Sequence, residues 1–321
     1  MSIEGLRISI ERARLLYPKR QVFVMVDRPC DIYGRLFERY IPEKVILIDV
    51  SKKKDFSVLN HSNSVVVIGF NSDESVCIYL RRFTEMSIKY VCSNDSINAR
   101  WWNISNLAEE ALISERQDCI VNGYSHFASD QLANIMQVID MTVNLSGQYV
   151  EIGVFRGTSA RSAINYMVRR NLEREVFLLD TYEGFNYEES KESSDAFWQE
   201  THTADMSRVI ERVNRTPGIS NEFKEKINVQ KCNIVSDKLP KNIDSICICN
   251  IDVDMYEAVL KALEKVWHLM VSGGVVIVQD PGRTPLLGGA RLALKLFLES
   301  TDSNEYFTVY LESGQTLIIK R

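Results

Sequence analysis

Residues 149–159, with the sequence YVEIGVFRGTS, constrain the fold of this chain more than any other segment. An apolar run ends in Glu151, and Gly153 and Gly157 then border a short loop that leads into a helical pattern. Glycine has no Cβ atom, so such a loop can turn sharply and let a ligand approach the backbone. The spacing E-x-G-x-x-x-G differs from the G-x-G-x-x-G of a pyrophosphate-binding loop, which argues against NAD. The segment predicts a strand, a cofactor loop and a helix.

A second apolar run, residues 175–179, ends in Asp180, roughly 20 residues after Gly157. In a βαβ unit, an acid at the end of the second strand can accept hydrogen bonds from both ribose hydroxyls of a nucleoside. A cofactor with a ribose but no need for a phosphate loop fits this pattern, and S-adenosylmethionine is such a molecule. The expected contacts are Glu151, Gly153, Phe155, Gly157, Ser159, Asp180, Thr181 and Tyr182. The alternative is a tight turn between strand and helix that binds no ligand.

Length, charge and cysteine usage narrow the class of protein. The 321 residues favour two domains over one, and the formal charge of −5 without a basic stripe excludes nucleic acid as the main partner. The first residues carry charges too often for a signal peptide, and no run has the apolar length of a membrane span. Seven cysteines without a C-x-x-C pair resemble buried small hydrophobes in a reducing compartment. We therefore expect a cytoplasmic protein with no membrane partner.

The hydrophobic patterns predict two α/β domains. Strand-like runs at 21–26, 44–50, 64–70 and 89–92 predict a smaller domain over residues 1–100. Residues 101–321 form the second domain, and its first part, 101–147, has helical spacing at 106–113 and 129–144. The polar stretch 117–128 between these helices is a candidate lid. The insertion 181–203 follows a strand's carboxyl end and is a candidate cover over the ligand crevice.

Acidic residues follow two further apolar runs. Residues 245–256, SICICNIDVDMY, bring Asp252 and Asp254 to the end of one predicted strand, and residues 271–280 end in Gln279 and Asp280. Period-two geometry sends Asp252 and Asp254 to the same side, and parallel strands place their carboxyl ends next to one another. We expect all four side chains to converge beside the reactive end of the cofactor, where carboxylates can hold a divalent cation or accept a proton. The alternative is that they cap loops between strands and helices.

The ordered set VEIGVFRGTSA, LLDTYEGF, NIDVDMY, SGGVVIVQD and GGARLALKLF resembles the S-adenosylmethionine-dependent sugar O-methyltransferases of the macrocin, mycinamicin and novobiocin type. The resemblance covers about residues 101–321. It implies a class I methyltransferase, an α/β fold with a Rossmann-like, seven-stranded, mainly parallel sheet, beside a smaller N-terminal α/β domain. The runs 306–310 and 316–319 predict its terminal hairpin. It also implies that residues 231–240 lie near the adenine, with Asn233 and Asp237 as candidate contacts.

The resemblance further implies a magnesium site and a reaction. In such enzymes the ion is held by the first Asp of the D-x-D pair and by an Asp-Asp pair after the next strand, which correspond to Asp252, Gln279 and Asp280 here. The amide oxygen of Gln279 supplies no charge, so we expect weaker Mg²⁺ binding or none. The implied reaction methylates a sugar hydroxyl of a glycan, a nucleotide sugar or a glycosylated natural product. We assign Asp254 as the base and Asp252, which contacts the cofactor, as a metal ligand, although the two could exchange roles.

Two other functions are compatible with parts of the sequence. One is a scaffold protein that binds the cofactor but has lost catalysis, which Gln279 makes conceivable. The other is an NAD-dependent oxidoreductase, which the loop spacing disfavours. In addition to a small-molecule or glycan acceptor we expect a second copy of the chain as a partner. The extra domain 1–100 is expected to bind the acceptor or to support a homo-oligomer.

Overall fold

The chain divides into two compact units, Met1–Asn103 and Ile104–Arg321, each described here by itself. The computed structural model describes residues 3–26, 45–49, 58–60, 62–69, 82–92, 105–122, 127–191, 201–282 and 288–321. No helix in these ranges combines the length and apolar character that a membrane crossing requires. The division between the units falls close to residue 100, where the sequence pattern changes.

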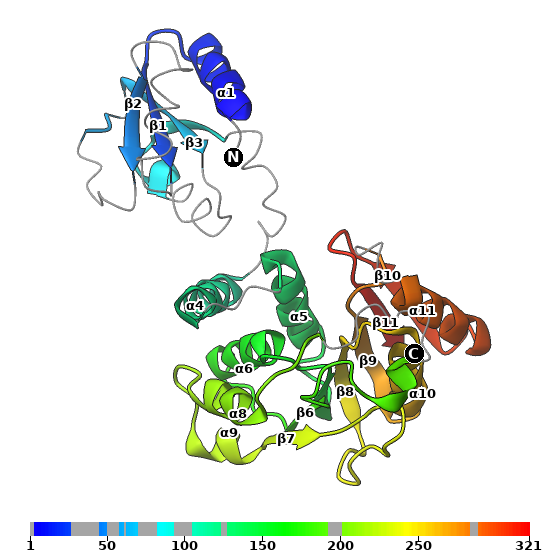
Figure 1. Ribbon diagram of the computed structural model, residues 1–321. Helices are drawn as coiled ribbons and strands as arrows, with labels where there is room; N and C mark the ends of the chain where they lie inside the picture. The colour runs from blue at the N-terminus through cyan, green and yellow to red at the C-terminus, as the bar shows by residue number, and fades with distance from the viewer. Residues whose placement is uncertain are drawn as a thin grey trace. The chain divides into compact units, whose positions relative to one another are not determined.

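The N-terminal unit contains a four-stranded parallel sheet in the order β2-β1-β3-β4 (Figure 1). Its elements are α1 (Ile3–Leu16), β1 (Gln21–Val26), β2 (Val45–Asp49), β3 (Ser64–Gly69) and β4 (Lys89–Cys92). Every residue of β3 is buried, because apolar groups pack on both sides of the sheet. Leu6 and Ile10 of α1 cover one side, and Phe83 lies in the apolar cluster on the other. The four strands lie within one residue of the predicted ones.

The second unit is built on a seven-stranded sheet in the order β10-β11-β9-β8-β5-β6-β7. The strands are parallel except that β11 runs antiparallel to both β9 and β10. This arrangement confirms the predicted class I methyltransferase sheet, and the terminal hairpin lies where the sequence placed it. The strands are β5 (Gln148–Ile152), β6 (Val176–Asp180), β7 (Ile227–Lys231), β8 (Ile246–Ile251), β9 (Met270–Val278), β10 (Tyr306–Tyr310) and β11 (Thr316–Lys320).

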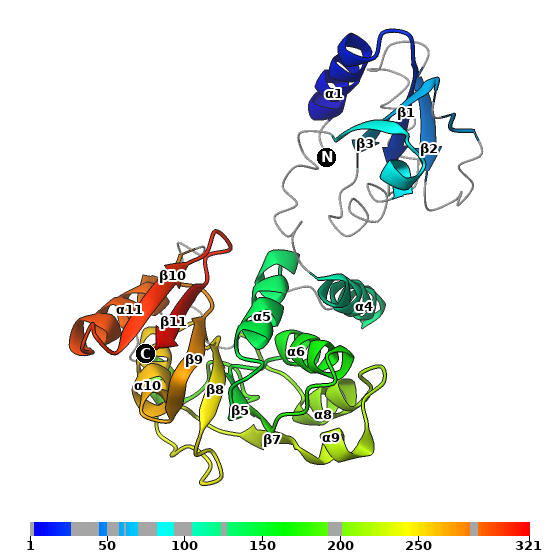
Figure 2. The same cartoon turned by 180° about the vertical axis from the view of Figure 1, so that it is seen from behind.

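Helices cover both faces of this sheet (Figures 1 and 2). Val150 and Ile152 of β5 point into the apolar core under α10 (Tyr256–Trp267) and α11 (Gly288–Ser300). Glu151, between them, points to the opposite face, where it bonds to Ser159 of α6. The helices on that face are α4 (Asn106–Asn122), α5 (Ser129–Met141) and α6 (Thr158–Arg169), and the shorter helices of the unit are α7 (Glu188–Lys191), α8 (Met206–Asn214) and α9 (Asn221–Glu225).

Helix α4 is longer than the sequence predicted. It continues through residues 117–122, which we expected to begin a polar lid, and the rest of that stretch lies partly outside the described residues. The physical reason is a set of charged side chains on its last turns. Glu115 and Asp118 bond to Arg212 of α8, and Glu115 also bonds to Arg161 of α6. The polar residues at the end of α4 therefore belong to an ionic contact between helices and not to a loop.

Arg212 connects this ionic cluster to the loop between β5 and α6. Its guanidinium donates to Glu115 at 2.7 Å and to Asp118 at 2.8 Å, and also to the carbonyl of Arg156 and the hydroxyl of Thr158 at 2.8 and 2.9 Å. Burial raises the pKa of Glu115, and the charges of Arg161 and Arg212 oppose that rise. The ionic cluster thus anchors the loop between β5 and α6 to α4 and α8.

Replacing Arg212 by Leu is expected to lower the free energy of unfolding by roughly 3–5 kcal/mol, because a buried carboxylate would lose one of its two arginine partners. Chemical denaturation of the full chain measures this loss. Arg215→Leu is the matched control: Arg215 pairs with Glu211 near the end of the same helix and is 75% exposed, so its loss costs less than about 1 kcal/mol. Equal losses in the two variants would contradict a structural role for the cluster.

Candidate active site

A pocket opens at the carboxyl ends of β5, β6, β8 and β9, where the strand order reverses between β5 and β8. In open α/β sheets ligands bind at such a reversal. The lining includes most of the predicted site together with several residues that the sequence did not single out. The lining residues are Phe127, Gln131, Ile152, Gly153, Val154, Phe155, Arg156, Thr158, Leu179, Asp180, Thr181, Gly184, Phe185, Tyr187, His202, Cys232, Asn233, Ile234, Asp252, Val253, Asp254, Ala258 and Asp280.

The loop after β5 packs directly on the end of β8. Gly153 adopts φ +91°, and a Cβ atom at this position would lie 2.0 Å from the carbonyl oxygen of Asp252. The N–H of Gly153 donates to the carbonyl of Leu179, which joins the same residue to the end of β6. Glycine is required here because the three strand ends could not approach one another around a side chain.

Asp180 fixes the shape of this loop and lines the pocket. Its Oδ2 accepts from the backbone N–H groups of Val154 and Phe155 at 2.7 and 2.8 Å. Its Oδ1 accepts from the backbone N–H of Tyr182 at 2.6 Å. A carboxylate offers about four lone-pair positions, so these bonds leave acceptor capacity toward the pocket. The acid at the end of the second strand thus organises the loop.

Glu151 lies behind the loop and does not line the pocket. It is fully buried, and it accepts hydrogen bonds from Tyr149 at 2.7 Å and from Ser159 at 2.6 Å. Burial raises the pKa of Glu151 to about 7, although these two hydrogen bonds oppose the rise. Gly157, Ser159 and Tyr182, expected at the cofactor, also lie outside the pocket lining. Gly157 and Ser159 lie at the start of α6, and Tyr182 supports the loop through the hydrogen bond of its backbone N–H to Asp180.

Glu151→Gln is expected to flatten the pH dependence of stability. The pKa of Glu151 is about 7 in the folded chain against an ordinary value of 4.5, so its contribution is fully present below pH 4.5 and is lost as the pH rises through 7. Between these limits the wild type should lose about 3 kcal/mol more than the variant. Urea denaturation at pH 5, 6, 7 and 8 measures the difference. Parallel profiles for the two proteins would show that Glu151 does not titrate in this range.

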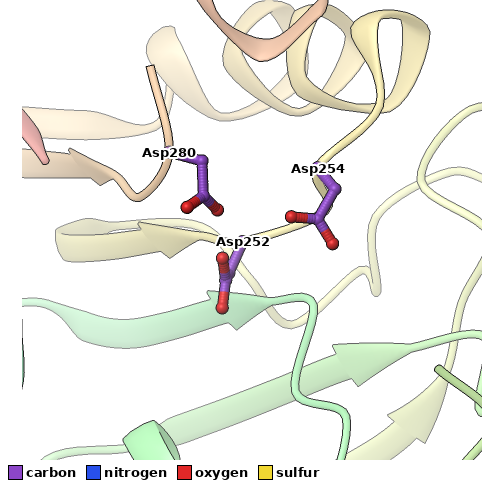
Figure 3. A group of neighbouring side chains, drawn as sticks. All are labelled: Asp252, Asp254 and Asp280. Carbon is purple, nitrogen blue, oxygen red and sulfur yellow. The ribbon is translucent and has the colours of Figure 1, made fainter. Parts of the chain in front are cut away.

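Three aspartates meet above the ends of β8 and β9. Asp252 and Asp254 lie on the segment after β8, and Asp280 lies beyond the end of β9 (Figure 3). One carboxylate oxygen from each lies within 4.8 Å of the others. Burial, followed by the charges of Asp280 and Asp254, raises the pKa of Asp252 well above its ordinary value. The three oxygens could hold a divalent cation, whose charge would offset the repulsion among them.

Gln279 does not line this pocket. Its side chain is 1% exposed, its Nε2 donates to Asn250 at 2.5 Å, and its Oε1 accepts from Gln315 at 2.8 Å. The sequence predicted that Gln279 would converge with the three aspartates. In the structure its amide is used at both ends by protein partners, because neighbouring residues at a strand end point in different directions.

The loop after β7 forms another wall of the pocket. Asn233 lines the pocket, whereas Asp237 accepts from the backbone N–H of Asn233 at 2.8 Å and shapes the turn. Lys265 of α10 donates to the carbonyls of Ile234 and Asp237, each at 2.6 Å. Of the two predicted contacts in this loop, the structure therefore brings Asn233 to the pocket and places Asp237 in a supporting position.

An aromatic cluster that sequence reasoning missed lies along the pocket, and its ring planes are tilted by 59° and 57° against one another. The ring of His202 lies 5.2 Å from the rings of both Phe155 and Phe185. An antiparallel bridge between Glu183 and Thr203 closes the base of the insertion and brings His202 back to the pocket. Phe155, His202 and Asp254 all have positive φ angles without being glycine, and such strained residues cluster at functional sites. The insertion itself was predicted as a cover, but no local signal pairs His202 with Phe155.

A model of the macrocin O-methyltransferase (TylF) family matches residues 79–305. The chain belongs to this family. The match extends over most of the second unit and includes the glycine loop, Asp180 and the three aspartates. It confirms the resemblance seen in the sequence and identifies the chain as an O-methyltransferase.

Solved structures agree with the family at the level of the fold. The chain is similar to the O-methyltransferase NovP, with 16% identity, coverage of 61% of this chain and 81% of NovP, and a TM-score of 0.52. It is also similar to the calicheamicin methyltransferase CalS11, with 14% identity, coverage of 67% of this chain and 93% of CalS11, and a TM-score of 0.50. No curated protein matches the chain. At these identities the structural likeness indicates a methyltransferase fold.

Proposed function

We propose that this member of the macrocin O-methyltransferase family transfers the methyl group of S-adenosylmethionine to a sugar hydroxyl. The observation that supports the proposal is that one pocket combines the glycine loop, Asp180 and three carboxylates. Methyl transfer requires alignment of two substrates and removal of one proton, and these groups can supply both.

The pocket suits a nucleoside cofactor along the ends of β5, β6 and β7. The backbone of Gly153 and Phe155 would face the methionine part, Asp180 and Thr181 the ribose, and Asn233 the adenine. Two observations support the fit. Asp180 lines the pocket and keeps acceptor capacity toward it beside its three backbone hydrogen bonds, and Asn233 lines the pocket on the loop after β7. A carboxylate with free acceptor positions suits ribose hydroxyls, and an amide side chain can both donate to and accept from a base.

The three aspartates provide the chemistry at the acceptor. With S-adenosylmethionine bound, the acceptor oxygen would attack the methyl carbon in line, and the electron pair of the breaking carbon–sulfur bond would stay on sulfur, which would give S-adenosylhomocysteine. We assign Asp254 as the base that takes the hydroxyl proton. Asp252 is close enough to Asp280 and Asp254 for their charges to raise its pKa. From this position it would orient both the base and the acceptor.

The same carboxylates fit a magnesium ion. Asp252 and Asp280 would hold it, with Asp254 within reach of the same position, since all three offer hard oxygen donors close together. When bound, Mg²⁺ lowers the pKa of a coordinated hydroxyl and offsets the negative charge of the cluster. The chain's own contribution is to keep three carboxylates converged in a partly buried site.

The acceptor side of the pocket favours a sugar. Phe155, Phe185 and Tyr187 offer apolar faces, and the carboxylates accept hydrogen bonds from hydroxyl groups. We extend the proposal to the setting of the enzyme. Four cysteines are buried free thiols, which supports a cytoplasmic location; they are Cys119, Cys232, Cys247 and Cys249. The N-terminal unit is proposed to bind the carrier of the sugar or to form a homo-oligomer.

Calorimetry and a methyl-transfer assay test the proposal together. S-adenosylmethionine should bind the full chain with a stoichiometry of one, NAD should not bind, and labelled methyl groups should pass to a panel of nucleotide sugars, glycans and glycosylated natural products. Failure to bind S-adenosylmethionine would contradict the proposal. Tight binding without transfer to any acceptor, with or without Mg²⁺, would instead favour a scaffold protein that has kept the cofactor site.

A further inference from the structure

A chain of buried amide side chains runs beneath the acceptor end of the pocket. It starts at Asn250 in β8, passes through Gln279 at the end of β9 and reaches Gln315 at the start of β11. From Gln315 it continues to Asn134 of α5 and to Ser313, at 2.7 and 2.8 Å. Asn250, Gln279 and Gln315 are each at most 1% exposed. These amide side chains therefore link two neighbouring strand ends, the terminal hairpin and α5 by direct hydrogen bonds.

Gln279 is the central member, and its position requires an amide. Its NH₂ group donates to the Oδ1 of Asn250, while its carbonyl accepts from the NH₂ group of Gln315. A carboxylate could accept from Gln315 but could not donate to Asn250. It would also bring a charge to a site that is almost fully buried, next to the three aspartates. The residue that departs from the family's aspartate thus fits the surroundings that this chain provides.

The amide chain reaches both sides of the pocket. Gln279 directly precedes Asp280, so its anchoring fixes the strand end from which the Asp280 carboxylate projects. At the other end, the Nε2 of Gln315 donates to the backbone carbonyl of Gln131, at 3.2 Å, and Gln131 lines the pocket. Loss of the hydrogen bond between Gln279 and Gln315, or of the one between Gln315 and Gln131, would let Asp280 and the first turn of α5 shift relative to each other.

We infer that Gln279 is a positioning residue that acts through the buried amide chain, and that it does not ligate a metal ion. The inference deepens the proposed function, because it states how Asp280 is held in that site. It also predicts that an aspartate at position 279 harms this enzyme, although the family resemblance implied a metal ligand there.

A double-mutant cycle of Gln279→Leu and Gln315→Leu in the full-length chain tests the coupling. Each single change should lower the melting temperature of the second unit by roughly 4–10 °C, because it leaves buried amides unsatisfied. The double variant should lose clearly less than the sum, since both changes break one chain. Asn221→Leu, at an exposed amide of α9 outside the amide chain, is the control and should shift the melting temperature by less than about 2 °C. Fully additive losses would overturn the inference.

Kinetics separate positioning from mere stability. At a temperature where both variants are folded, Gln279→Leu and Gln315→Leu should each lower kcat by roughly 10–100-fold, because small displacements of reacting groups are costly. KM for S-adenosylmethionine should stay within about 2-fold, since the two substituted side chains bond to Asn250, Asn134, Ser313, Gln131 and each other and not to the glycine loop or Asp180. An unchanged kcat in both variants would overturn the positioning role. Loss of cofactor binding in the wild type would count against the proposed function and leave the thermal cycle valid.

The variant Gln279→Asp distinguishes positioning from metal ligation. It also provides an independent test of the inference if the leucine variants do not fold. The aspartate should lower the melting temperature by about as much as leucine and should not tighten the binding of Mg²⁺, measured by calorimetry with the metal alone. An aspartate variant that binds Mg²⁺ at least about 10-fold more tightly with an unchanged melting temperature would show that position 279 faces a metal, and it would overturn the inference.

Discussion

Asp254→Asn is expected to lower kcat by about 10²–10⁴-fold, because an amide cannot take the proton that the acceptor hydroxyl must lose. Binding of S-adenosylmethionine should change little, since the substitution keeps the shape of the side chain and Asp254 lies on the acceptor side. The fold should also be kept: Asp254 has φ +56°, a left-handed conformation that asparagine tolerates well. Steady-state kinetics with a sugar acceptor measure kcat, and calorimetry measures cofactor affinity.

Parallel variants separate the base from the metal ligands. Asp252→Asn and Asp280→Asn should raise the Mg²⁺ concentration needed for half-maximal activity, whereas Asp254→Asn should lower kcat even at saturating Mg²⁺. Asp244→Asn, in the exposed loop before β8, is the control and should leave both quantities unchanged. If Asp252→Asn has the larger effect on kcat at saturating Mg²⁺, the two residues have exchanged roles. A full rate in all three site variants would contradict catalysis by this cluster.

Local patterns in the sequence were sufficient to predict much of the fold. The terminal hairpin lies at Tyr306–Tyr310 and Thr316–Lys320, within one residue of the prediction, because two apolar runs flank a glycine turn. Asp252, Asp254 and Asp280 converge as predicted, since parallel strands bring their carboxyl ends to one edge of the sheet. These features depend on strand periodicity and on chain connectivity, and both can be read from neighbouring residues.

Features that depend on the direction of a side chain or on a distant partner could not be predicted. Strand periodicity places Glu151 opposite Val150 and Ile152 but does not say which face meets the cofactor, and Glu151 points to α6. Gln279 was assigned to the metal from the family resemblance, whereas Asn250 and Gln315 determine where it points. His202 reaches the pocket only because the chain folds back along Glu183. Contacts between distant segments decide each of these cases.

Gly153→Ala is expected to destabilise the second unit by roughly 3–5 kcal/mol and to abolish detectable binding of S-adenosylmethionine. The added Cβ would lie 2.0 Å from the carbonyl oxygen of Asp252 and 2.5 Å from its carbonyl carbon. Both atoms are backbone, so no side-chain rotation can relieve the overlap, and φ +91° is strained for alanine as well. The end of β8 would have to move away from the loop after β5. Thermal unfolding and calorimetry with the cofactor measure the two effects.

Two other glycines are controls for this substitution. Gly288→Ala, where an added Cβ meets nothing within 4 Å, should leave stability unchanged or raise it by less than about 1 kcal/mol. Gly157→Ala adds a methyl group 3.2 Å from one side-chain methyl of Val209, and Gly157 itself has φ +77°, so an intermediate loss is expected. This order of effects follows from what each Cβ would touch. Because Asp252 belongs to the acidic cluster and Gly153 to the cofactor loop, a graded loss that is largest at Gly153 would indicate that the two halves of the site are held together by direct backbone contact. Equal losses at Gly153 and Gly157 would show that the conformation of the loop matters and that its contact with β8 does not.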